Sequence, residues 1–451
     1  MRITSIGSTR SIDGGNKYAS IITGWCGLKR QALLAFIVAL QLAATFSTQI
    51  IVVRFIGIGV QTDAFSAALT IPAVLSAILI AALQSVWLPR FSAESSNKEL
   101  WRDNLKVALG QSMLLSGGIF ILAVGTMQWW LHYIFPDFSI AQLSSAITLS
   151  SILSIASIFN VLSSILVIAF RSQSRFYKIE IIALLGTIFS LIALFYVIPI
   201  WGLVGVALIT LGRSLIIFII QMAFLGWPSI SVGRGYKSCK TWRLMGPVFA
   251  GAIIYKTSPL VDRFWASQSS IGGLTLFNLA QMAVGALAIM LERSICVPII
   301  SRFGYYVANR DYKELKSSYR FGVFQITLIS ILFVFAMILL KDPFIEIIKF
   351  ILNVNIDDAS NIWWLCLLYV GYLHVSASGG LPVAVLYSLN DTKTPFIIGM
   401  IGFIASLFIK AFSFILFSLP GLVLATSIYY ILNMAFMCWI CERGINARNS
   451  Q

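Results

Sequence analysis

Charged side chains are scarce in this sequence. Of its 451 residues, only 11% are Asp, Glu, Lys or Arg, whereas 59% are hydrophobic. A soluble domain of ordinary composition carries about 25% charged residues. So few charges cannot cover a folded surface with groups that water solvates. The composition therefore excludes an ordinary soluble protein and indicates that lipid surrounds most of the folded chain.

Patterns of catalytic residues are also missing. The sequence has two widely separated histidines, no Gly-rich phosphate loop of the P-loop form and no Ser-His-Asp set. Its one C-x-x-C pair, Cys438 and Cys441, ends an apolar helix and has no second pair to complete a metal site. The large external loop expected of a polysaccharide polymerase is absent. We therefore predict that the protein is not an enzyme and uses no metal or cofactor.

Long apolar runs fill most of the chain. About 20 apolar residues suffice to cross a bilayer as a helix, and these runs are too long and continuous for barrel strands. We therefore predict an all-α polytopic membrane protein of about twelve transmembrane helices. The predicted spans are 31–53, 63–89, 107–132, 146–170, 179–200, 202–226, 244–265, 274–299, 321–340, 361–388, 396–418 and 420–441.

The net charge of +15 follows a topological pattern that argues against nucleic-acid binding. Of the 32 Lys and Arg residues, 24 lie in the two terminal segments and in alternate gaps between spans, and four lie on the opposite side. Basic loops stay in the cytoplasm, so we predict a protein of the bacterial inner membrane with both termini cytoplasmic. The polar, basic residues 1–30 are interpreted as a cytoplasmic tail, because no short apolar core with a cleavage site follows them.

An internal repeat divides the spans into two halves. Arg54-Phe55 ends the first span, with Pro89 35 residues later, and Arg263-Phe264 ends the seventh, with Pro298 again 35 residues later. Parallel repeats are typical of transporters whose site lies between two halves. The predicted organisation is listed here: a tail (1–30), an N-terminal six-helix lobe (31–226), a cytoplasmic linker (227–243), a C-terminal six-helix lobe (244–441) and a second tail (442–451).

Four basic residues lie deep inside predicted spans: Arg213, Lys256, Arg293 and Lys410. A charge at membrane depth is costly and usually faces protein or water. Lys256 and Arg293, on spans seven and eight, are our candidates for binding a phosphate-bearing anion. The alternative for each is an interhelical ion pair or a side chain that extends to the interface. Asp262 is interpreted as an interfacial residue.

Polar residues give the first span a distinct face. Gln41, Thr45, Thr48 and Gln49 follow helical spacing on one side, and Gln84 adds a polar group to span two. Such a face either lines a wet cavity or bonds a neighbouring helix, and we favour the cavity. Pro72 in span two and Pro259 in span seven can bend their helices, as gating helices often do.

Two segments resemble signatures of the MurJ/MviN flippase family, which belongs to the superfamily of multidrug, oligosaccharidyl-lipid and polysaccharide exporters. One runs from Arg54 to Phe65 and contains Thr62-Asp63-Ala64-Phe65; the other is Asp391-Thr392-Lys393-Thr394-Pro395. The resemblance implies two six-helix lobes around a central cavity, alternating access, and an undecaprenyl-pyrophosphate-linked saccharide as cargo. It also gives Asp63 a role in gating, whereas a carboxylate at a helix start could instead be a structural cap.

The sequence also departs from the family. Members that move the peptidoglycan precursor carry arginines where this chain has Leu42, Thr48 and Ser76, and an acid-Arg pair near 278–281 is replaced by uncharged residues. These departures favour an exopolysaccharide or O-antigen repeat unit, carried from the inner to the outer leaflet. The alternatives are lipid II for peptidoglycan synthesis and cation-coupled drug antiport. The expected partners are the lipid-linked saccharide, the bilayer, and the glycosyltransferases and polymerase of the same pathway.

Overall fold

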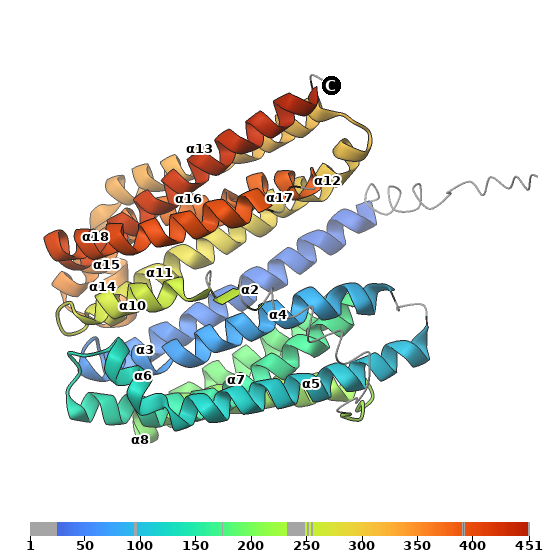
Figure 1. Ribbon diagram of the computed structural model, residues 1–451. Coiled ribbons are helices and arrows are strands. Elements are labelled where there is room, and N and C mark those ends of the chain that lie inside the picture. The colour runs from blue at the N-terminus through green and yellow to red at the C-terminus, as the bar shows by residue number, and fades with distance from the viewer. Residues whose placement is uncertain are drawn as a thin grey trace, which may run out of the picture.

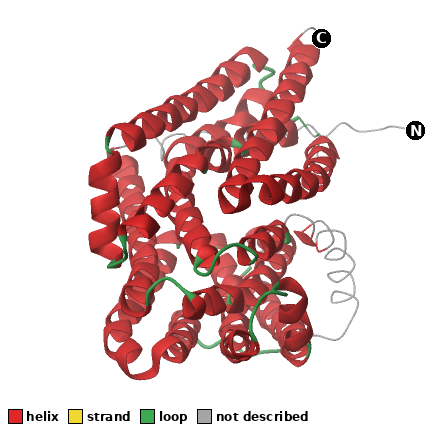
Figure 2. Cartoon of the chain, turned by 90° about the vertical axis from the view of Figure 1, so that its left-hand side faces the viewer, coloured by secondary structure: helices red, strands yellow, loops and turns green. Residues whose placement is uncertain are grey.

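The part of the chain that the structure describes consists of helices joined by short loops and turns. The computed structural model describes residues 25–93, 97–173, 175–231, 249, 252–253, 256–389, 391 and 393–449. Figures 1 and 2 show helices packed into two groups, one from each half of the chain, with no strand among the described residues. The predicted all-α membrane fold with two lobes is confirmed.

The first lobe contains all helices before residue 231. Its elements are α2 (Trp25–Ile56), α3 (Val60–Ala68), α4 (Thr70–Ala93), α5 (Lys98–Gly125), α6 (Met127–Ile134), α7 (Ile140–Ser172) and α8 (Phe176–Phe224). Helix α2 begins at Trp25, so it takes in the last residues of the tail predicted at 1–30. The lobe is built around α7, which packs against α3, α4, α5 and α8.

The second lobe repeats this plan with more interruptions. Its elements are α10 (Ser258–Ser267), α11 (Gly273–Leu291), the π-helix η1 (Glu292–Cys296), α12 (Val297–Ala308), α13 (Tyr312–Leu339), α14 (Lys341–Leu352), α15 (Ile356–Leu368), α16 (Val370–Ser378), α17 (Gly380–Ser388) and α18 (Lys393–Asn449). Most of the linker predicted at 227–243, and much of span seven before Lys256, lie outside the described residues.

Two of the helices each contain two membrane spans. Gly202 in α8 and Ser418 in α18 have non-helical backbone angles, with φ of 51° and 54°. The chain reverses at these points. A Cβ on Gly186 would lie 2.6 Å from the Ile217 side chain, and one on Gly402 would lie 3.1 Å from Asn433, so the two limbs of each hairpin touch. The nine long apolar helices among the described residues thus account for eleven spans, and span seven ends in α10.

Prolines explain where the other spans are broken. A proline has no N–H to donate to the carbonyl four residues earlier, and its ring crowds that carbonyl. Pro72 follows the end of α3 at Ala68 by four residues, and Pro382 follows the end of α16 at Ser378 by the same interval. Pro298 likewise follows η1, where the helix loosens into a π-turn. Pro72 thus accounts for the boundary between α3 and α4 at Leu69, and the bend predicted there stays a prediction, because Leu69 keeps helical backbone angles.

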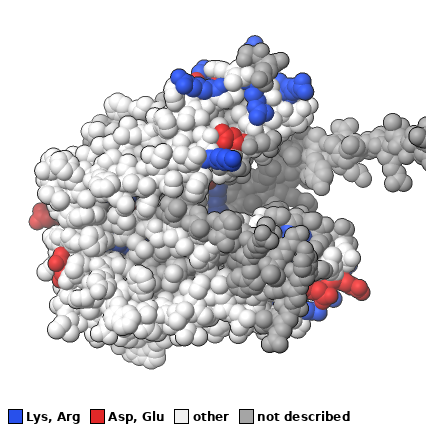
Figure 3. All heavy atoms as spheres, viewed as in Figure 1, with Lys and Arg blue, Asp and Glu red and all other residues white. Residues whose placement is uncertain are grey.

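Among the described residues, one buried hydrophobic core extends across both lobes at one end. One cluster of buried residues joins Val52 and Phe65 of the first lobe to Leu276 and Phe277 of the second. A separate cluster of buried residues around Trp87 lies in the first lobe, toward the other end of α4, and Phe249 from the second half of the chain packs against it. Figure 3 shows the surface hollowed between the two lobes at that other end. We call the end around Asp63 the closed end and the opposite one the open end.

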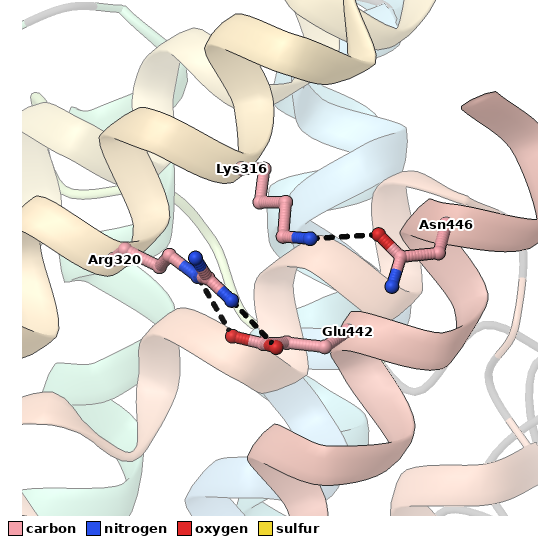
Figure 4. A network of polar contacts seen from close by, with 4 residues as sticks. All are labelled: Lys316, Arg320, Glu442 and Asn446. Carbon is pink, nitrogen blue, oxygen red and sulfur yellow. Dashed lines mark hydrogen bonds and ion pairs between the residues drawn. The ribbon is translucent and has the colours of Figure 1, made fainter.

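Near the open end, a polar network ties α13 to α18. The Arg320 guanidinium donates two hydrogen bonds to the Glu442 carboxylate, each 2.8 Å long, and Lys316 Nζ donates to Asn446 Oδ1 at 2.7 Å (Figure 4). The two-pronged geometry fixes the relative rotation of the helices better than a single contact would. The network shows that α18 continues as a packed helix to Asn449, past the span predicted to end at 441.

The Asp391-Pro395 motif begins α18. Asp391 Oδ1 accepts a hydrogen bond from the Thr394 N–H at 3.0 Å, which satisfies one of the free donors at the helix N-terminus. Hydrogen bonds from the Thr394 side chain and backbone lower the pKa of Asp391 below its ordinary value of 3.8. The cap is therefore charged at neutral pH, and its contribution to stability is lost only as the pH falls through this lowered pKa.

We expect Asp391→Ala to destabilise the folded protein by about 1 kcal/mol, because the cap is removed while the helix remains. Thermal unfolding in detergent measures the change. Asp391→Asn is the matched control: an amide oxygen caps nearly as well, so its melting temperature should stay near that of the wild type. Equal losses for both variants would contradict the capping role.

Candidate functional site

Asp63 joins the two lobes at the closed end. Its carboxylate accepts hydrogen bonds from the Gly272 N–H at 2.7 Å, the Thr275 N–H at 2.8 Å and the Thr275 hydroxyl at 2.6 Å. Asp63 lies on α3 in the first lobe, and its partners begin α11 in the second. Only 5% of its surface is exposed. The helix that Asp63 caps is therefore α11 of the opposite lobe, rather than the helix that carries it.

Gly272 is the repeat mate of Asp63. The two residues are 209 positions apart, the same offset that separates Arg54 from Arg263 and Pro89 from Pro298. Gly272 has a φ of 85°, and a Cβ there would lie 2.7 Å from the Ile58 side chain. Only glycine fits this left-handed conformation in this space. The N–H that binds the carboxylate thus depends on the missing side chain.

The two repeat-related arginines also cross between the lobes. Arg54, at the end of α2, donates from Nη1 to the carbonyls of Phe350 and Ile351 at 3.3 and 3.1 Å. These carbonyls lie in the last turn of α14, where backbone acceptors are free and a cation is favoured. Arg263 on α10 donates from Nη1 to the Thr70 hydroxyl on α4 at 2.9 Å. Each lobe therefore sends one arginine into the other at the closed end.

An apolar cavity of about 430 Å³ lies between α2 and the second lobe. Its walls come from α2, α11, α13, α14 and α15, and every lining residue is apolar. Leu42 and Phe46 contribute from α2, Met290 from α11, and Phe344 and Ile348 from α14. The cavity accommodates hydrocarbon and offers nothing to a sugar or a phosphate.

The polar face predicted on α2 lies away from this cavity. Gln41, Thr45, Thr48 and Gln49 are half-buried and are not among the cavity-lining residues. The Thr45 and Thr48 hydroxyls donate to carbonyls of their own helix, at 2.9 and 2.6 Å. Gln49 borders a small gap between the lobes, beside Thr275. Of the four, Gln49 has the clearest position between the lobes.

Lys256 and Arg293 are both exposed. Lys256 lies two residues before α10, and Arg293 lies in the π-helix η1. Neither forms an ion pair within the described part of the chain. Single π-helical turns within α-helices frequently occur at functional sites, and the sequence analysis did not anticipate this one. Pro298, four residues after Ser294, was the signal that could have indicated it.

The remaining predicted residues occupy separate positions. Pro259 is at the second position of α10, where its missing N–H costs nothing. Gln84 is half-buried on α4, toward the open end. Pro72 is buried just after the α3–α4 break. Asp262 is not interfacial as predicted: it is buried and paired with Lys410 of α18.

We expect Asp63→Ala to open the closed end, because two N–H groups and a hydroxyl lose a charged acceptor. Spin labels at the exposed positions Val60 and Ile271, one on each lobe, should report a longer inter-lobe distance. The separated population should rise about tenfold or more. Thr275→Val removes one of the three bonds and should give a smaller rise. An unchanged distance distribution in folded Asp63→Ala protein would contradict this role.

Comparison with known proteins shows which proteins resemble this chain in sequence and in fold. Residues 52–450 match the family described as "Lipid II flippase MurJ". A solved structure described as "Lipid II flippase MurJ, inward closed conformation" aligns with a TM-score of 0.78 and 16% identity, over 93% of this chain and 89% of that one. Among curated proteins, none matches the sequence significantly.

Two other transporters share the fold. An inward-facing multidrug resistance MATE family transporter of the MOP superfamily aligns with a TM-score of 0.74 and 14% identity, over 90% of this chain and 96% of that one. A MOP superfamily transporter from Pyrococcus furiosus aligns with a TM-score of 0.65 and 14% identity, over 93% and 96%. At these identities, the structural likenesses establish the fold alone. The sequence match over residues 52–450 goes further: the chain belongs to the MurJ lipid II flippase family.

Proposed function

We propose that the protein carries lipid II from the inner to the outer leaflet of the cytoplasmic membrane. The observation that carries this proposal is the family match over residues 52–450. The absence of arginines at Leu42, Thr48 and Ser76 favours an exopolysaccharide or O-antigen unit, with lipid II as the alternative. The family match supports lipid II.

The closed end supplies a gate for alternating access. The three hydrogen bonds of Asp63 and the two arginine contacts hold the lobes together there. At the open end the surface between the lobes is hollowed (Figure 3). A cargo headgroup enters from the open end, and release on the other side requires these few bonds to break. These six hydrogen bonds can be exchanged for bonds to water without unfolding either lobe.

Lys256 and Arg293 provide the charge for a pyrophosphate headgroup. An anion that leaves water needs protein cations, because an unpaired charge in an apolar medium is prohibitively costly. Both residues are exposed and form no ion pair within the described chain, although the Glu292 carboxylate lies within electrostatic range of Arg293. Gln41, Thr45, Thr48, Gln49 and Gln84 add polar groups on spans one and two, where sugar hydroxyls would lie.

The cavity between α2 and α14 suits the polyprenyl chain. Its lining is apolar throughout, and it lies between the two lobes on the side of α2 opposite the polar face. A headgroup between the lobes and a hydrocarbon tail in this cavity would occupy opposite faces of one helix. The tail thus remains in an apolar medium while the headgroup crosses.

We propose the orientation that the distribution of basic residues indicates. The open end carries most Lys and Arg residues and faces the cytoplasm. Moving a cargo of about −2 charges outward then gains roughly 4–5 kcal/mol per 100 mV of membrane potential. The emptied cationic site returns inward, a direction that the same potential favours.

Reporters fused at exposed loop positions should confirm this orientation. A reporter inserted after Asn97 or Asn309, at the open end, should give a cytoplasmic signal, and one inserted after Asn353, beyond α14, should give an external signal. The reason is the concentration of Lys and Arg at the open end. An external signal from either open-end fusion would contradict the orientation.

The cargo can be tested in cells depleted of their own lipid II flippase. With the protein expressed, lipid II should become accessible to an externally added enzyme that cleaves it at the outer leaflet, and growth should recover. An empty vector is the control for leakage. If lipid II stays protected while another lipid-linked saccharide becomes accessible, the protein is a flippase of different cargo.

The same assay tests the anion site. Lys256→Ala and Arg293→Ala should each lower lipid II exposure roughly tenfold, because each removes a charge-assisted contact. Arg293→Lys should recover part of the activity, since the charge is retained. Lys98→Ala, at an exposed position that starts α5, is the matched control for charge loss. Full activity in the double alanine variant would exclude this pair.

A further inference from the structure

A buried ion pair lies inside the second lobe, apart from the contacts between the lobes. Lys410 Nζ on α18 lies 2.6 Å from Asp262 Oδ1 on α10. The Lys410 side chain is fully buried, and that of Asp262 is 6% exposed. The ammonium also lies 5.8 Å from the centre of the Tyr429 ring, a favourable position for a cation. The transport mechanism proposed above makes no use of this pair.

Such a pair is costly to bury and needs a reason. A carboxylate taken out of water needs hydrogen-bond donors, a proton, a metal cation or a basic side chain to offset the lost hydration. Here the basic side chain is Lys410 on α18, which pairs with the Asp262 carboxylate on α10 in the interior of the lobe. If one charge were removed, the other would be left uncompensated in an apolar medium, which is strongly destabilising.

The other titratable groups around Asp262 leave Lys410 as its direct partner. Tyr369 and Tyr372, at the start of α16, and Tyr430 on α18 lie within electrostatic range but are neutral phenols. Arg263, the next residue on α10, points its guanidinium toward Thr70 in the other lobe. Helix α4 packs against α10, and the α4 group that meets Arg263 there is the uncharged Thr70 hydroxyl. Lys410 alone contacts the carboxylate at ion-pair distance.

We propose that Asp262 is a monovalent-cation site which the chain's own Lys410 ammonium fills. With this tethered cation in place, the second lobe takes up neither sodium nor a proton at Asp262 as the lobes alternate. This consequence for the transport cycle rests on the proposed flippase function, whereas the site itself does not. Removing the ammonium leaves a carboxylate that only a small cation or a proton can neutralise.

The test compares melting temperatures of purified, cargo-free protein in detergent, in sodium chloride and in N-methyl-D-glucamine chloride at equal ionic strength. Lys410→Met keeps the apolar stem and deletes the charge. We expect sodium to raise its melting temperature by at least about 2 °C over the bulky organic cation, because the ligand binds only the folded state. Lowering the pH from 8 to 6 should also stabilise this variant more than the wild type, because proton uptake neutralises the carboxylate.

The wild type, one control variant and one double variant complete the comparison. The wild type should show no selective response to sodium, because its site is filled. Lys349→Met removes a charge at an exposed position of α14 and should also show none. Asp262→Asn combined with Lys410→Met removes both charges, so it should lose the sodium response and recover stability relative to Lys410→Met. Recovery by this double variant supports the proposal even if Lys410→Met alone fails to fold.

Two results would overturn the proposal. One is a saturable sodium response in the wild type that Asp262→Asn abolishes, because the site would then be open to external cations. The other is a folded Lys410→Met protein whose stability responds to neither sodium nor pH. Because the measurement uses no cargo, failure of the lipid II assay would leave this inference standing, and the reverse also holds.

Discussion

The contact between the Asp63 carboxylate and the first turn of α11 is the interaction on which the arrangement of the lobes depends. A buried carboxylate is expensive unless its oxygens are bonded, and here two backbone N–H groups and one hydroxyl supply those bonds. The N-terminus of α11 adds the favourable end of a helix dipole. These donors are free only because they begin a helix, so the contact needs the break in the chain before Gly273. In the transport cycle proposed above, the same bonds pass to water when the lobes separate.

The internal repeat explains why so few residues close this end. Residues near a pseudo-two-fold axis meet their own repeat mates, and Asp63 meets Gly272, 209 positions later. These two residues differ in chemistry: Asp63 supplies a carboxylate, and Gly272 supplies a backbone N–H that is accessible because glycine has no side chain. Arg54 and Arg263, further from the axis, cross in opposite directions and find different partners. The two halves therefore make a complementary contact here rather than an identical one.

Three of the four deep basic residues, Lys410, Lys256 and Arg293, divide into two groups. Lys410 forms an ion pair with Asp262 inside the second lobe, where it neutralises the buried carboxylate. Lys256 and Arg293 are exposed and form no ion pair in the described chain, which is why we propose them as the anion site. A membrane protein cannot leave a cation unmatched in hydrocarbon. The positions of these three residues therefore distinguish one charge that is neutralised inside the protein from two charges at its surface, which we propose bind the cargo.

The sequence by itself determined the helical membrane fold, the two lobes and the family, because lipid permits so few backbone structures that apolar length and the repeat are informative. It also singled out Asp63, Arg54 and the break at Pro72. Tertiary structure decided which groups meet. The partners of Asp63 lie 209 and 212 residues away, and a local pattern cannot indicate which helix a carboxylate caps. Asp262 was assigned to the interface because Lys410, its partner, is far along the chain. Hydropathy fixes how deep a residue lies along its helix, whereas the packing of the helices fixes which neighbour it faces.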